Sequence, residues 1–198
     1  MMIEKFLQTK TWSTELKLQF FDEISNYSND EKCYWVYEIA NNILRKPDDM
    51  NLIIAEDILV FATQHYSDVE DTNKKALIYY KLGELYEIYK EDYIKAYTAY
   101  EKYNINNTEF DGIHSILLRV LLLRDDFTYS EEMENELKLS YGETDLGLRK
   151  DRIYENIGSL IIAQKNNDTD LSEKLIKRIK AILKADELFF LDLVFRKD

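Results

Sequence analysis

The chain has 198 residues, 45% of them apolar, which is enough to bury a core of its own. Its 38 acidic and 26 basic residues give a formal net charge of -12. This charge disfavours nucleic acid and anionic membrane as partners, because a phosphate-binding surface needs clustered Lys and Arg. A single proline, five isolated glycines and periodic runs of Leu, Ile, Lys, Glu and Tyr favour an all-helical fold.

Nothing in the hydropathy pattern predicts a leader or a membrane span. The first ten residues, MMIEKFLQTK, lack the long apolar core of a signal peptide, and the longest apolar run, 116–123, is interrupted by Arg119. The only cysteine, Cys33, has no partner for an internal disulfide, which agrees with a reducing compartment. We therefore expect a cytoplasmic protein with no membrane contact.

The first predicted helix covers residues 13–27, with Ser13 or Thr14 as its N-cap and Leu16, Phe20 and Ile24 on one face. A helix pair over residues 30–66 follows. The capping-box pattern Ser28-x-x-Glu31 opens its first helix, which should bury Val36, Ile39, Ala40 and Ile43. Pro47 ends this helix, and the second helix of the pair should bury Ala55, Leu59 and Ala62.

The segment 72–105 carries the clearest periodicity in the chain. Tyr79, Leu82, Tyr86 and Tyr89 recur at spacings of three and four residues, and Tyr93, Ala96, Tyr100 and Tyr103 do so after a turn at residues 90–92. These stripes predict two facing helices. Gly83 lies inside the first helix, where glycine costs ~1 kcal/mol relative to alanine. It indicates that a neighbouring helix crosses there too closely for a side chain.

These residues resemble the tetratricopeptide repeat, a helix-turn-helix unit of about 34 residues. The resemblance rests on Tyr79, Leu82, Gly83 and Tyr86 in the first helix and on Asp92, Tyr93, Ala96 and Tyr100 in the second. The turn has one residue more than the family pattern, and Tyr103 stands where the family has a small residue. The resemblance implies a short right-handed solenoid of antiparallel helix hairpins.

Further pairs are predicted over residues 109–141 and 146–184, with a C-terminal capping helix over 185–196. Tyr154, Ile157, Gly158 and Ile161 repeat the central pattern, and the second-helix anchors Ala55, Ala96 and Met133 lie 41 and 37 residues apart. We thus expect a single all-α domain over 1–198 with about 9–10 helices. These periods exceed 34 residues, so generic helical hairpins remain an alternative to true repeats. The apolar C-terminal helix either caps the fold of a monomer or forms a homodimer contact.

In this family the binding groove is lined by first-helix residues beside the packing stripe. Carried over to this sequence, with the acidic segment added, the resemblance implies partner-binding residues at Tyr34, Tyr37, Asn41, Tyr80, Glu84, Glu87, Glu131, Glu134, Glu155 and Asn156. Tyrosine suits a protein-binding surface, because it supplies area and hydrogen bonds at a low entropic cost. Biased codon usage is the other explanation for fifteen tyrosines.

No pattern in the chain predicts catalysis. The two histidines, His65 and His114, belong to no recognisable metal or catalytic motif, and no glycine-rich loop is present to hold phosphate. Cys33 has no obvious histidine partner and is interpreted as a buried structural thiol. We therefore expect no enzyme activity, no cofactor and no metal.

Two charged segments remain. Residues 125–145 hold eight acidic residues against Lys138, whereas Lys174, Lys177, Arg178, Lys180 and Lys184 line an amphipathic helix. The basic edge is interpreted as a solvated helix face, with polyanion binding as the competing hypothesis. The sequence predicts a non-enzymatic protein-binding module. The alternative is an immunity or antitoxin protein that neutralises a basic toxin such as a nuclease, because an acidic inhibitor attracts a cationic active site.

Overall fold

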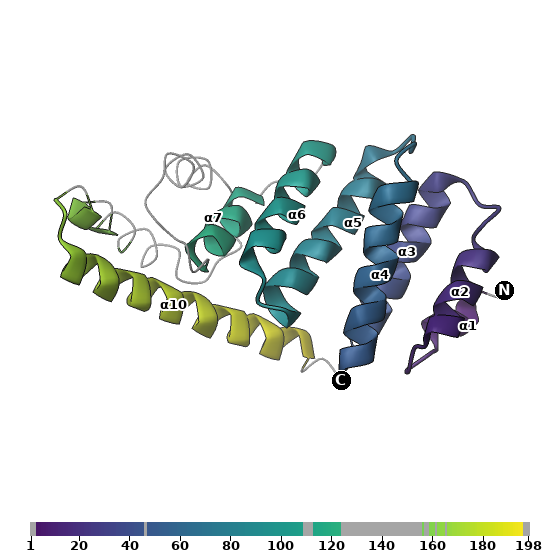
Figure 1. Cartoon of the computed structure of the whole chain (residues 1–198), viewed down its shortest axis with the longest axis horizontal. Helices are drawn as coiled ribbons and strands as arrows, with labels where there is room; N and C mark the ends of the chain where they lie inside the picture. Colours follow the sequence, from purple (N-terminus) through teal and green to yellow (C-terminus); the bar gives the residue numbers. More distant parts are fainter. Residues whose placement is uncertain are drawn as a thin grey trace. The chain divides into compact units, whose positions relative to one another are not determined.

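The computed structural model describes residues 3–45, 47–108, 113–123, 156, 159–160, 162–164 and 166–195. All regular elements in these ranges are helical, which confirms the prediction of an all-α protein (Figure 1). The chain divides into two compact units, Met1–Phe110 and Asp111–Asp198. Within the described part, no helix combines the length and the apolar character needed to cross a bilayer.

The first unit starts with two helices around an aromatic cluster. Helix α1 spans Glu4–Leu7 and α2 spans Thr14–Glu23. The buried rings of Phe6, Trp12 and Phe20 pack together with centroids 5.5 to 6.2 Å apart. Ser13 caps α2 by accepting a 3.3 Å hydrogen bond from the Leu16 amide. The helix ends four residues earlier than predicted, because residues 25–27 turn the chain towards the next cap.

Helices α3 (Asn29–Leu44) and α4 (Asp49–His65) pack against each other. The predicted capping box is present: the Glu31 amide donates to Ser28 Oγ at 3.3 Å, and the Ser28 amide donates to Glu31 Oε2 at 3.0 Å. Asp48, just after Pro47, caps α4 through the Asn51 amide at 2.8 Å. All seven apolar residues predicted to be inward are buried: Val36, Ile39, Ala40, Ile43, Ala55, Leu59 and Ala62.

Helix α5 (Thr72–Glu84) continues into a π-helical turn, η1 (Leu85–Tyr89), before α6 (Tyr93–Asn106) returns alongside it. The Lys90 amide donates to the Leu85 carbonyl at 3.2 Å, the i to i-5 bond of a π turn. Such a turn holds one residue more than an α turn. It therefore accommodates the extra residue seen in the sequence at this hairpin.

Gly83 lies directly against the ring of Tyr100 on α6. A Cβ atom built at Gly83 would be 2.6 Å from Cδ1 of Tyr100, far inside van der Waals contact. Both residues are buried, and α5 and α6 are in close contact along their length. The predicted close approach at Gly83 is therefore confirmed, with a tyrosine ring as the neighbour.

Polar contacts in the first unit recur at one separation along the chain. Residues 39 to 41 positions apart are joined between Trp12 and Asn51, Lys17 and Asp57, Asn29 and Asp68, Asp30 and Glu70, and Asn41 and Lys81. This separation matches the 41 residues between Ala55 and Ala96. Successive segments of about 40 residues are thus joined through similar positions, while the solenoid arrangement stays a prediction.

The second unit contains α7 (Ile113–Leu123) and α10 (Thr169–Phe195), which pack together (Figure 1). Leu117 and Val120 of α7 and Leu175 and Ile179 of α10 are buried. Helix α10 is continuous, so the separate capping helix predicted from residue 185 is instead the second half of one long helix. The helices predicted within 124–155 lie outside the described residues.

Candidate partner-binding surface

Helix α3 presents three of the predicted binding residues on one stripe. Tyr34, Tyr37 and Asn41 are spaced three and four residues apart, which places them on the same side of the helix. Tyr34 is 47% exposed and meets the neighbouring Trp35 edge to face, with ring centroids 5.1 Å apart. Tyr37 and Asn41 are half-buried where α5 packs on α3. The stripe therefore offers one open aromatic and two partly covered polar groups.

A lysine that the sequence analysis did not single out links α3 to α5. Lys81 is only 8% exposed; its Nζ donates to Asn41 Oδ1 at 3.2 Å and forms an ion pair with Glu84. The same ammonium lies 5.6 Å from the ring centroid of Tyr37. Tyr37, Asn41 and Glu84 are thus brought together around one buried cation. The i,i+3 spacing of Lys81 and Glu84 was the available signal in the sequence.

Tyr37 and Tyr89, whose pKa values are both affected by Glu84, stay neutral at physiological pH. Burial raises the pKa of Tyr37, and the nearby carboxylates of Glu84 and Glu38 raise it further. Burial and then Glu84 also raise the pKa of Tyr89, whose hydroxyl donates to the Leu44 carbonyl at 3.0 Å. The cluster can accordingly supply hydrogen bonds, ring area and one compensated ion pair.

Two residues predicted to line the groove, Tyr80 and Glu87, contact α6 in the structure. Tyr80 packs edge to face on Tyr100 and Tyr103 of α6, with centroids 5.7 and 5.2 Å away. Glu87 is 1% exposed and accepts a 2.9 Å hydrogen bond from the Tyr100 hydroxyl. It belongs to the π-helical turn, whose wider geometry changes the direction of its side chains relative to a regular α-helix. The expectation that Glu87 lines an open groove is therefore wrong.

The remaining predicted residues belong to the second unit. Glu131, Glu134 and Glu155 lie outside the described residues. Asn156 is 7% exposed, so its side chain is largely inaccessible to a partner. The candidate binding surface in the described residues is consequently the α3–α5 surface, which we define as Tyr34, Tyr37, Asn41, Lys81 and Glu84.

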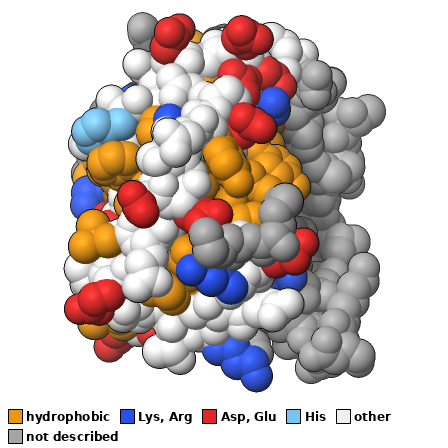
Figure 2. Space-filling view, turned by 90° about the vertical axis from the view of Figure 1, so that its right-hand side faces the viewer, with side chains coloured by type: hydrophobic (Ala, Val, Ile, Leu, Met, Phe, Trp, Pro, Cys, Tyr) orange, Lys and Arg blue, Asp and Glu red, His pale blue; other side chains and the backbone are white. Residues whose placement is uncertain are grey.

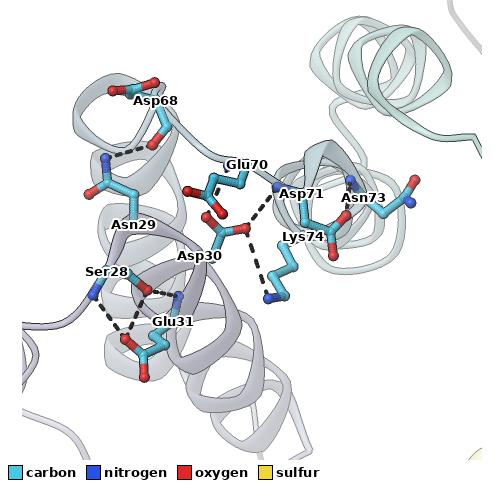
Figure 3. A network of polar contacts seen from close by, with 9 residues as sticks. All are labelled: Ser28, Asn29, Asp30, Glu31, Asp68, Glu70, Asp71, Asn73 and Lys74. Atoms are coloured by element: carbon cyan, nitrogen blue, oxygen red, sulfur yellow. Dashed lines mark hydrogen bonds and ion pairs between the residues drawn. The ribbon is translucent and has the colours of Figure 1, made fainter.

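A second polar cluster joins the start of α3 to the loop before α5 (Figure 3). The Asp30 carboxylate accepts hydrogen bonds from the amides of Glu70 at 3.0 Å and Asp71 at 2.9 Å, and Lys74 lies 3.9 Å away. These two backbone bonds hold the pKa of Asp30 below its usual value. These residues and Asp68 line a shallow cavity of about 520 Å³. The rim of the cavity, which we call the acidic edge around Asp30, is held in place by its own hydrogen bonds.

The described residues show no cluster of three or more His, Cys, Asp or Glu side chains arranged to hold a metal ion. Cys33 is buried, and desolvation followed by the charge of Asp30 raises the pKa of its thiol to about 11. Such a thiol is protonated at neutral pH and reacts slowly.

Comparison with known proteins assigns no family: no family model matches the chain, and no curated protein or solved structure is significantly similar to it.

Proposed function

We propose that this protein is a non-enzymatic protein-binding scaffold, a tetratricopeptide-like stack of helix pairs that receives a protein partner on the α3–α5 surface. The observation that carries the proposal is the convergence of Tyr37, Asn41 and Glu84 on Lys81, beside the exposed Tyr34. Residues about 40 positions apart form this surface, as expected when helix pairs repeat.

The chemistry of the surface suits binding better than catalysis. An exposed tyrosine packed on a tryptophan is a rigid anchor that loses little entropy when a partner covers it. The Lys81 and Glu84 ion pair, next to Tyr37 and Asn41, keeps these two side chains in place before a partner arrives. Preorganisation of this kind favours affinity.

A second candidate function is neutralisation of a basic toxin, such as a nuclease, by an immunity protein. The acidic edge around Asp30 favours it, because the described residues that line it include Asp30, Asp68, Glu70 and Asp71 but, among basic residues, Lys74 alone (Figure 3). Together with the net charge of -12 this edge would attract a cationic protein and speed its capture.

Affinity capture of the tagged protein from its host lysate, at low and at high salt with mass spectrometry, tests both functions. We expect Tyr34→Ala to reduce recovery of the bound protein, whereas Ile105→Ala, at an 81% exposed position on α6, should leave it unchanged. A stoichiometric basic protein released at high salt indicates toxin neutralisation. A partner retained at high salt indicates a general scaffold, and no specific partner in either eluate contradicts both functions.

A further inference from the structure

We draw no further inference here: the strongest candidate, the apolar surface patch that Leu18 of α2 forms with Val60 and Phe61 of α4 at the N-terminal end of the first unit, where Figure 2 shows hydrophobic side chains at the surface, supports no proposal, because nothing in the described residues shows what covers it.

Discussion

Replacing Gly83 by alanine tests whether α5 and α6 are as close as the structure shows. In an open helix this substitution would stabilise the protein by about 1 kcal/mol, because alanine restricts the unfolded chain and favours the helix. Here the new methyl group would meet the Tyr100 ring, with Cδ1 only 2.6 Å away. Tyr100 is 1% exposed, and its ring packs against Tyr80. Its hydroxyl donates a hydrogen bond to the Glu87 carboxylate.

The size of the effect follows from these two opposing contributions. Overpacking a core costs about 1–3 kcal/mol, and the anchored ring argues for the upper half of that range. After the gain in helix propensity is subtracted, we expect a net loss of about 1–2 kcal/mol in the free energy of unfolding. For a chain of this size that loss lowers Tm by roughly 2–8 °C.

Urea unfolding followed by far-ultraviolet circular dichroism measures this loss. Gly83→Val should be more destabilising than Gly83→Ala, because the added volume is larger. In a Tyr100→Leu background the alanine should become less harmful, since the ring is gone; the double-mutant cycle isolates this coupling. If Gly83→Ala equals or exceeds the wild type in stability, the inferred close packing of α5 on Tyr100 is incorrect.

Four further predictions concern stability and reactivity. Ser28→Ala removes the capping box and should lower the free energy of unfolding by about 1 kcal/mol, measured by urea denaturation; no change would show that the cap is dispensable. Asp30→Asn should be destabilising at neutral pH. Because the folded pKa of Asp30 is lowered, the wild-type advantage should be present above the unfolded pKa and disappear as the pH falls through the folded pKa; a pH-independent difference in unfolding curves would contradict this. Burial raises the pKa of Tyr103 to about 12. The neutral side chain should therefore contribute fully to the free energy of unfolding below the unfolded pKa of about 10, and this contribution should be lost as the pH rises from about 10 to about 12. Tyrosinate absorbance in the wild type and in Tyr103→Phe measures this, and titration of Tyr103 near its ordinary value would refute it. Cys33, with its pKa raised to about 11, should react with a thiol reagent far more slowly in the native protein than in urea, and equal rates would argue against its burial.

The local signals in the sequence predicted the bounds of α3 and α4 and the start of α2 well, whereas α1 was not predicted and α2 ends earlier than expected. Ser13 and Ser28 cap α2 and α3 through amides three residues away, so the whole interaction is contained in a short sequence window. The inward stripes of α3 and α4 follow from helical periodicity alone. Gly83 also carried long-range information, because a glycine inside a helix indicates a close neighbour even when that neighbour is unknown.

The candidate site was only partly predictable. Tyr37, Asn41 and Glu84 were expected on one surface, and they do meet there, but the buried Lys81 that joins them was not expected. The burial of Glu87 was also missed. It depends on the π-helical turn, which one extra residue indicates but does not place.

The amino-acid sequence by itself thus determined the helical class, the caps, the inward stripes and the acidic charge, because hydrogen bonds within four residues and a period of 3.6 residues act locally. Tertiary structure alone decided which polar groups were buried, where Gly83 met Tyr100, and that Phe21 of α2 packed on Phe61 of α4. Those features depend on contacts between residues 13 to 40 positions apart. Only the packed chain brings such residues together.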